Sequence, residues 1–239
     1  MAWKICGLIG TLTLGLAAMG CDSSGGDDPE GSGGATSTGT GTTGPSPYTG
    51  IAINPMNGWV SRMDNAASIQ GAFYTFDDNE DGGTFEINPE TYETYGPDIC
   101  ADGMAEQVMN MEFSTFWGGA IGFNLNQEEG SDTAMPYDAT ANGVTGFAFD
   151  IGPLPIGGEL RFNVLVAGEP DNNYCKRITA ETGMANEFRW SDLQLNCWAA
   201  EPVNPDATKI EAVHWQIVTN QSAAYPYDFC VSNITALQD

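Results

Sequence analysis

A ten-residue stretch near the C-terminus, residues 210–219, limits most strongly what this chain can fold into. Two sets of side chains alternate along it, one apolar and one mostly polar. The apolar set is Val213, Trp215 and Ile217, and the other set is Ala212, His214 and Gln216. A period of two is typical of a β-strand with one face in a core. We therefore expect residues 210–219 to form a strand with Trp215 buried.

Similar short segments recur along the chain between clusters of Gly, Pro, Asn and Asp. The expected strands are Ile69–Phe76, Phe116–Leu125, Val144–Ile151, Leu160–Ala167, Arg177–Thr182, Glu187–Leu193, Ile210–Thr219 and Asp228–Ile234. Helical periodicity is weak throughout, and residues 101–111 have room for one short helix at most. The pattern predicts an all-β domain built as a β-sandwich.

The N-terminus has the pattern of an export signal. Lys4 precedes an apolar run from Ile5 to Met19 that is too short for a membrane span but typical of a signal-peptide core. Residues 16–21 resemble a bacterial lipobox, in which the cysteine is acylated, although Ala18 replaces the usual Leu. The resemblance implies a signal peptide over residues 1–20 and a lipid on Cys21. The alternative is ordinary cleavage that leaves a spare thiol.

Residues 21–47 contain Gly, Ser, Thr and Asp without a large apolar side chain. Such a segment cannot offset its ordering entropy by burial, so we expect a disordered tether before a folded domain of residues 48–239. The protein would contact the membrane only through its lipid anchor. This organisation predicts a location in the cell envelope, at the bacterial outer membrane or cell surface.

Four cysteines belong to the folded part, and an even number in an exported chain predicts two disulfides with three connectivities. Cys175 and Cys197 flank an expected hairpin, Arg177–Leu195, which favours their pairing and leaves Cys100 for Cys230. Zinc is a poor alternative, since no Cys-x-x-Cys pair is present and His214 is the single histidine.

The charge balance excludes one class of partner. The chain has 7 Lys and Arg against 32 Asp and Glu, a net charge of −25, which repels nucleic-acid phosphates. High acidity also serves solubility.

Several segments resemble galactose-binding-domain-like jelly rolls, especially the carbohydrate-binding modules of bacterial glucanases. They read AVHWQIVTN, YPYDFCVSNITAL, FRWSDLQ and YDATANGVTGFAFDI. The opening segment GWVSRMDNAASIQGAFYTFDD resembles secreted myxobacterial-type lipoproteins with this jelly roll, so the resemblance covers residues 57–237. It implies a ligand cleft on the concave face, with polar contacts from the positions of Arg161, Asn163 and Gln216.

Strand parity adds a candidate binding face. The side chains that alternate with the apolar ones are Asn124, Asp150, Arg161, Asn163, Arg189, His214 and Gln216. If their strands belong to one sheet, these groups share an outer face, and planar amides, carboxylates and guanidinium groups are suited to sugar hydroxyls. The predicted ligand contacts are Arg161, Asn163 and Gln216, with Arg189, His214 and Asp150 at the margins. The alternative is an ordinary solvated sheet face.

The aromatic side chains argue against a strongly aromatic sugar site. Trp117, Trp190 and Trp215 have the parity of the core. The side chains that remain as stacking platforms are Tyr74, Trp198, Tyr225 and Tyr227.

An acidic segment provides a candidate calcium site. Asp77, Asn79 and Asp81 supply oxygen ligands at alternate positions before Gly82, which permits a sharp turn. The twelfth position from Asp77 is Asn88, where an EF-hand has a bidentate Glu. The resemblance to jelly-roll modules implies a structural Ca²⁺ here, and the alternative is a solvated loop.

The sequence gives little support for catalysis. It has no Gly-x-Ser-x-Gly elbow and no His-x-x-Glu-His metal pair. We therefore expect a non-catalytic, carbohydrate-binding surface lipoprotein whose partner is a polysaccharide or other glycan, and not an enzyme. The alternatives are a structural or adhesive envelope lipoprotein that binds a protein partner, and a glycoside hydrolase.

Overall fold

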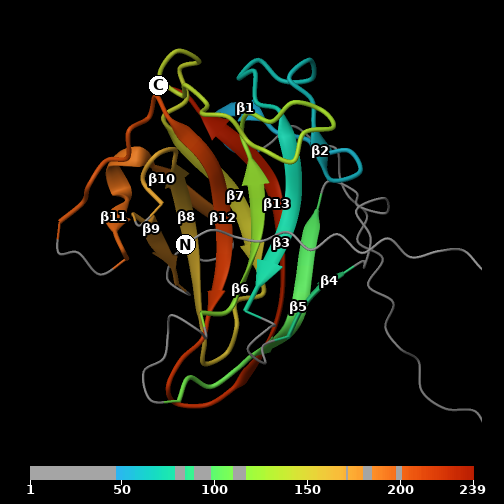
Figure 1. The fold of residues 1–239 in the computed structure, drawn as a ribbon, viewed down its shortest axis with the longest axis vertical. Coiled ribbons are helices and arrows are strands. Elements are labelled where there is room, and N and C mark those ends of the chain that lie inside the picture. The colour runs from blue at the N-terminus through green and yellow to red at the C-terminus, as the bar shows by residue number, and fades with distance from the viewer. Residues whose placement is uncertain are drawn as a thin grey trace, which may run out of the picture. The chain divides into compact units, whose positions relative to one another are not determined.

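The computed structural model describes residues 47–78, 84–88, 98–109, 117–170, 172–179, 185–197 and 201–239. These residues belong to one compact unit, Thr40–Asp239. They form two β-sheets in which every pair of neighbouring strands is antiparallel (Figure 1). Within the described ranges, no helix is both long and apolar enough to span a bilayer.

One sheet has six strands in the order β10-β7-β13-β5-β4, and β1 pairs with β13 beside this path. Its strands are β1 (Gly50–Ala52), β4 (Thr84–Asn88), β5 (Ile99–Ala105), β7 (Gly146–Gly152), β10 (Ala185–Arg189) and β13 (Tyr225–Leu237). The long strand β13 bonds to β5 through its first half and to β7 through its second half.

The other sheet has seven strands in the order β11-β9-β8-β12-β6-β3-β2. Its strands are β2 (Trp59–Val60), β3 (Gly71–Asp77), β6 (Gly119–Asn124), β8 (Glu159–Val166), β9 (Tyr174–Ile178), β11 (Gln194–Leu195) and β12 (Ile210–Val218). Strand β12, which contains the alternating segment that most constrained the fold, lies at the centre between β8 and β6.

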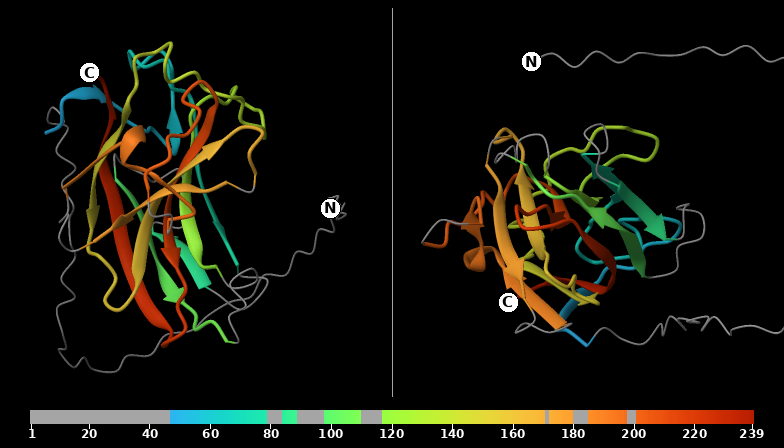
Figure 2. Two further views of the ribbon diagram at one scale, coloured as in Figure 1. Left: turned by 90° about the vertical axis from the view of Figure 1, so that its left-hand side faces the viewer. Right: turned by 90° about the horizontal axis from the view of Figure 1, so that it is seen from below.

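The chain passes from one sheet to the other between most consecutive strands, as from β5 to β6, β6 to β7, β7 to β8 and β12 to β13. Only neighbours such as β4 and β5, or β8 and β9, form hairpins within a sheet. This alternation is the jelly-roll arrangement of a β-sandwich, so the all-β fold predicted from the sequence is confirmed. Figure 2 shows the sandwich from two further sides.

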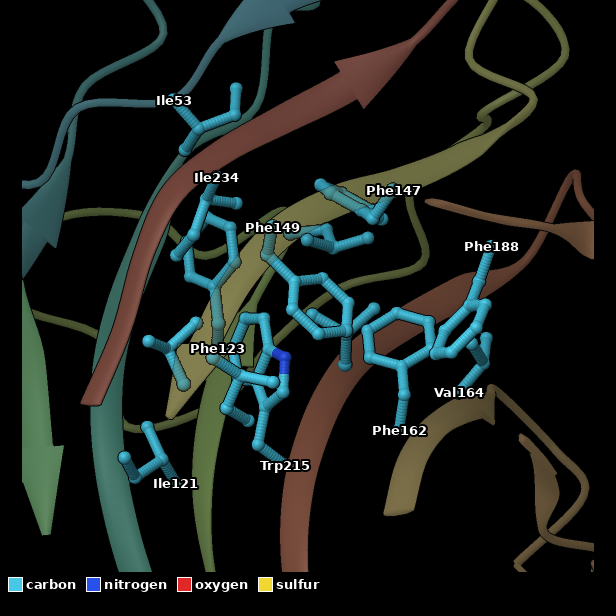
Figure 3. Packing of buried hydrophobic residues seen from close by; sticks show 14 of the residues in the cluster. Ile53, Ile121, Phe123, Phe147, Phe149, Phe162, Val164, Phe188, Trp215 and Ile234 are labelled. Carbon is cyan, nitrogen blue, oxygen red and sulfur yellow. The ribbon is translucent and has the colours of Figure 1, made fainter. Parts of the chain in front are cut away.

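The core lies between the two sheets and is rich in aromatic side chains (Figure 3). Trp215 of β12 is fully buried, with ring centroids 5.4 Å from Phe149 of β7 and 5.9 Å from Phe162 of β8. Phe73 and Phe123 stack with centroids 4.3 Å apart. Because Trp215 and Phe149 come from different sheets, their contact joins the two layers.

Two disulfides are present, Cys100–Cys230 and Cys175–Cys197, which are the predicted pairs. The first joins β5 to β13 at directly opposed positions. The hairpin expected between Cys175 and Cys197 is wrong, because the chain leaves β9, enters the other sheet as β10 and returns as β11. Strand β11 then pairs with β9, with Gln194 opposite Cys175, and this pairing brings the two cysteines together.

Two local expectations also differ from the structure. Residues 101–105 belong to strand β5, not to a short helix. Its buried side chains are Ile99, Ala101 and Ala105, so small residues weaken the alternating signal. The strand expected at 187–193 ends at Arg189 and continues as a short 3-10 helix, Trp190–Asp192.

Candidate functional site

The outer face of the seven-stranded sheet carries polar side chains in two rows across its central strands. In one row, Arg161 of β8 lies opposite Gln216 of β12. In the next row, Asn163 lies opposite His214, which faces Gly122 on its other side. Their parity is opposite to that of the buried Phe162 and Trp215. Four predicted ligand contacts therefore share one surface.

A cleft of about 810 Å³ lies over the first of these rows, a volume within the range of ligand-binding clefts. Its floor includes Arg161 and Gln216, and the rest of its lining comes from loops and strand ends. The lining residues are Trp117, Gly157, Gly158, Glu159, Arg161, Asn173, Asn196, Gln216, Val218, Thr219, Asn220, Gln221 and Ser222. Carboxamide side chains are the most frequent polar groups in this lining.

Three residues form a directional chain of hydrogen bonds beneath the cleft. The amide Nδ2 of Asn163 donates to Oε1 of Gln216 at 2.7 Å, and Nε2 of Gln216 donates to the backbone carbonyl of Trp117 at 3.3 Å. Asn163 is only 3% exposed and does not line the cleft itself. Its part is therefore to hold Gln216 in place.

The charged groups of the cleft are linked to one another. Nε of Arg161 donates to Oε1 of Glu159, and Nε of Arg177 lies 3.3 Å from the same oxygen. The side chain of Arg161 is 15% exposed, whereas that of Arg177 is 52% exposed. Glu159 thus holds the Arg161 side chain in place on the cleft floor. Arg177, on the neighbouring strand β9, is more exposed to solvent.

Trp117 lies at the cleft and not in the core, contrary to the parity prediction. Its ring packs on Phe76 of β3 with centroids 5.4 Å apart, and Phe76 in turn packs on His214. The alternation fails at Gly118, which has φ of 104° and whose added Cβ would meet the Ile217 carbonyl oxygen at 2.0 Å. Only glycine adopts this backbone readily, and the resulting turn moves Trp117 to the outer face.

His214 is buried against neighbouring aromatic side chains. It is 7% exposed, and its Nε2 lies 2.8 Å from the Tyr74 hydroxyl. The Tyr74 ring packs over Gly122, where it occupies the space that a Cβ would need. Burial lowers the pKa of His214 to about 3, so the imidazole is neutral at physiological pH. Although His214 lies on the predicted face, it is covered by aromatic rings and does not line the cleft.

Asp150 and Arg189 do not belong to this face, and their placement at its margin was wrong. They lie on β7 and β10, which belong to the six-stranded sheet. Asp150 accepts hydrogen bonds from the Tyr48 hydroxyl and from Nδ2 of Asn233, so it fastens the first described residues to that sheet. The alternation of apolar and polar residues predicts whether each side chain points toward the core or away from it. It does not predict the sheet to which a strand belongs.

Arg189 has its own set of partners near the C-terminus. Its Nη1 donates to the Thr145 hydroxyl and to Asp239, both at 2.9 Å. Nη2 also lies 3.5 Å from Glu187. The guanidinium therefore links strand β10 to the end of the chain.

Loop residues that strand parity could not detect form the walls of the cleft. Asn173 and Asn196 come together because the Cys175–Cys197 disulfide joins their segments. The backbone N–H of Asn196 donates to the backbone carbonyl of Asn173 at 2.6 Å. Their nearness in sequence to two cysteines was the available signal. On the other wall, the Tyr225 ring occupies the space where Gly158 would carry a Cβ.

Two of the remaining predicted platforms, Tyr225 and Tyr227, are buried rings. Tyr225 and Tyr227 are 4% and 5% exposed, and Tyr225 donates to the Val218 carbonyl. Trp198 lies outside the described residues. Among the described residues that line the cleft, Trp117 is therefore the one with an aromatic side chain.

The calcium hypothesis cannot be placed on the structure, because Asn79 and Asp81 lie outside the described residues. Asp77 ends strand β3, and the next residue, Asp78, is buried and accepts a hydrogen bond from the Gly118 amide at 2.7 Å. Burial raises the pKa of Asp78. The described ranges contain no group of three metal-ligating side chains, and calcium binding stays a prediction.

No protein-family model matches the chain, and no curated protein matches it. Among solved structures, it is similar to the family 11 carbohydrate-binding module of the cellulosomal cellulase Lic26A-Cel5E of Clostridium thermocellum. The two are 13% identical, with a TM-score of 0.38, over 71% of this chain and 88% of that chain. A structure of the family 11 module from Clostridium thermocellum with a β-1,3-1,4-mixed-linked tetrasaccharide is 14% identical, with a TM-score of 0.40, and 71% and 91% of the two chains are covered.

The agarase AgWH50C is also similar, with 13% identity and a TM-score of 0.36 over 69% of this chain and 24% of that chain. The solved structures that are similar to this chain thus include both carbohydrate-binding modules and an agarase. The ligand of this chain has to follow from the chemistry of its own cleft.

Proposed function

We propose that this protein binds carbohydrate without catalysis, in the cleft on the outer face of the seven-stranded sheet. The observation that carries the proposal is the convergence of Arg161, Gln216 and Trp117 in one cleft of about 810 Å³. Arg161 and Gln216 come from neighbouring strands of a rigid sheet, and each is held by hydrogen bonds to its neighbours. A ligand would therefore meet side chains that are already ordered, which lowers the entropy cost of binding.

The composition of the lining favours a ligand rich in hydroxyl groups. Five carboxamide side chains line the cleft: Asn173, Asn196, Gln216, Asn220 and Gln221. A carboxamide both donates and accepts hydrogen bonds, as a sugar hydroxyl does. The half-buried ring of Trp117 adds an apolar surface against which a sugar ring can pack.

The charge of the lining supports a non-catalytic role. Glu159 is the one carboxylate among the described lining residues, and it is bonded to two arginines. Glycoside hydrolysis generally uses two carboxyl groups, one of them a proton donor. The arrangement suits recognition of a sugar better than cleavage of its glycosidic bond.

Replacing Arg161 with alanine should weaken glycan binding by about 1–2 kcal/mol, roughly 5- to 30-fold in Kd, because hydrogen bonds from a guanidinium are lost. Thermal unfolding should stay close to that of the wild type. Isothermal titration calorimetry against a panel of plant, algal and bacterial polysaccharides checks the prediction. Arg62→Ala is the matched control, because Arg62 pairs with Glu128 on loops outside the cleft lining.

Full affinity in Arg161→Ala would show that the binding site lies elsewhere on the domain. If the wild type binds no polysaccharide in the panel, the proposed function is wrong and a protein partner becomes the better explanation.

We also propose that the domain is held at the cell envelope by a lipid on Cys21, which follows from the lipobox-like sequence before that residue. Replacing Cys21 with serine should move the protein from the membrane fraction to the soluble fraction, because acylation requires the thiol. Metabolic labelling with a fatty acid, followed by fractionation, measures this directly. A wild-type protein that is soluble and unlabelled would contradict the anchor.

A further inference from the structure

We propose that the cleft selects carbohydrates that carry an anionic group, either a carboxylate or a sulfate ester. This inference rests on the proposed function and names the class of ligand that the same cleft would hold. It comes from an imbalance of charge on strands β8 and β9, at one side of the cleft floor.

Two guanidinium groups share one carboxylate at this place. Oε1 of Glu159 accepts from Nε of Arg161 and lies 3.3 Å from Nε of Arg177. The three side chains together carry one net positive charge. Both arginines use Nε for this contact, and within the described ranges Glu159 is the one recorded ion-pair partner of each. The terminal Nη groups of Arg161, which lines the cleft, therefore remain suited to a ligand, and Arg177 adds its charge nearby.

The other recorded ion pairs have a different charge balance. Arg62 pairs with Glu128, and Lys209 pairs with Asp206. Arg189 contacts two carboxylates, those of Glu187 and Asp239. Among the ion pairs of the described residues, positive charge exceeds negative charge only at Arg161, Glu159 and Arg177.

The acidity of the whole chain does not cancel this local excess. The net charge is −25, but exposed charges farther away than a Debye length, about 8 Å at physiological ionic strength, are largely screened. Glu159 is the one carboxylate among the described residues that line the cleft. An anion on the cleft floor would therefore respond mainly to Arg161 and Arg177.

The chain of hydrogen bonds from Asn163 through Gln216 to Trp117 also leaves hydrogen-bond donors on the cleft floor. The Trp117 carbonyl can only accept, so the Gln216 atom that faces it at 3.3 Å has to be the Nε2 donor. Oε1 of Gln216 then faces Asn163, whose Nδ2 donates to it. Gln216 keeps a second N–H on Nε2, and with the Nη groups of Arg161 this makes a floor of donors. Carboxylate and sulfate oxygens are pure acceptors and suit such a floor.

Two matched pairs of oligosaccharides test the inference with the full-length chain. The first pair is tetragalacturonate and its methyl ester, which share a backbone and differ in charge. The second is a κ-carrageenan tetrasaccharide and the same tetrasaccharide after desulfation, which tests sulfate. We expect the charged member of at least one pair to bind about tenfold more tightly, since a hydrogen-bonded ionic contact is lost in its neutral partner. Raising the NaCl concentration from about 50 to about 500 mM should reduce this preference.

Arg177→Gln separates charge from contact, because Arg177 is half exposed and does not line the cleft. It should weaken binding of the charged member roughly two- to fivefold, as expected for an exposed ionic interaction, and leave the neutral member unchanged. Arg62→Gln removes the same charge outside the cleft and should change neither.

The two pairs also distinguish the two anionic groups. Binding of tetragalacturonate alone identifies a carboxylate ligand, and binding of the κ-carrageenan tetrasaccharide alone identifies a sulfate ester. Equal or tighter binding of both neutral members would overturn this inference and leave the proposed function intact. Failure of all four oligosaccharides to bind would also overturn it. The proposed function itself fails only if the wider polysaccharide panel gives no binding.

Discussion

Replacing Trp215 with alanine should lower the free energy of unfolding by about 3–5 kcal/mol, the largest effect expected for a side-chain truncation in this domain. The indole is fully buried at the centre of β12 and contacts Phe149 of the opposite sheet and Phe162 of its own sheet. Its loss leaves a cavity between the layers that the surrounding rings cannot fill without moving. Urea unfolding followed by circular dichroism measures the change.

Trp215→Phe is the matched control, because it keeps an aromatic ring in the same space. Among the described residues, the buried Nε1 of Trp215 also has no hydrogen-bond partner, so phenylalanine removes no bond to any of them. The control should therefore be clearly less destabilising than alanine. Trp117→Ala should leave the unfolding midpoint nearly unchanged, because Trp117 is a half-buried side chain of the cleft. A small effect of Trp215→Ala would show that the two sheets do not depend on this contact.

Removal of the Cys100–Cys230 disulfide, by replacing both cysteines with serine, should destabilise the domain by about 5 kcal/mol if the bond acts through chain entropy. The two cysteines are 130 residues apart in sequence, so the closed loop includes most of the sandwich. The bond spans opposed positions on β5 and β13 and lies outside the cleft lining. Glycan affinity measured on the folded protein should therefore stay close to the wild-type value.

The Cys175–Cys197 disulfide provides the contrasting variant. Its separation of 22 residues predicts a smaller loss, about 3 kcal/mol. This bond also holds Asn173 and Asn196 together at the cleft, so its removal should reduce glycan affinity. Peptide mapping under non-reducing conditions checks both bonds. A different pairing would contradict the predicted connectivity, and four free thiols in the folded domain would contradict the compartment inferred from the sequence.

Much of the sandwich could be predicted from the sequence, because alternation reports directly on which side chains are buried. Trp215 was assigned to the core on this basis, and it is buried there. Alternation contains no information about which strands are neighbours. Asp150 points outward as expected, but its strand β7 pairs with β13 in the other sheet. Sheet membership depends on contacts between residues far apart in sequence, which a local pattern cannot report.

The cleft was predicted only in part for a related reason. Arg161 and Gln216 lie on regular strands, and their shared surface followed from parity. Trp117 precedes a glycine with positive φ, where the period of two no longer holds. Asn173 and Asn196 lie in segments that are brought together by a disulfide and by the short pairing of β11 with β9. Loop positions of this kind depend on the folded structure and have no periodic signal.

The hydrogen bond between Tyr48 and Asp150 determines the side of the domain on which the described part of the chain begins. It fastens the beginning of the folded region to the outer side of the six-stranded sheet, whereas the cleft opens on the seven-stranded sheet. Any support that holds the N-terminal side of the chain therefore pulls on the back of the sandwich. A ligand bound in the cleft would lie on the opposite side of the sandwich from Tyr48.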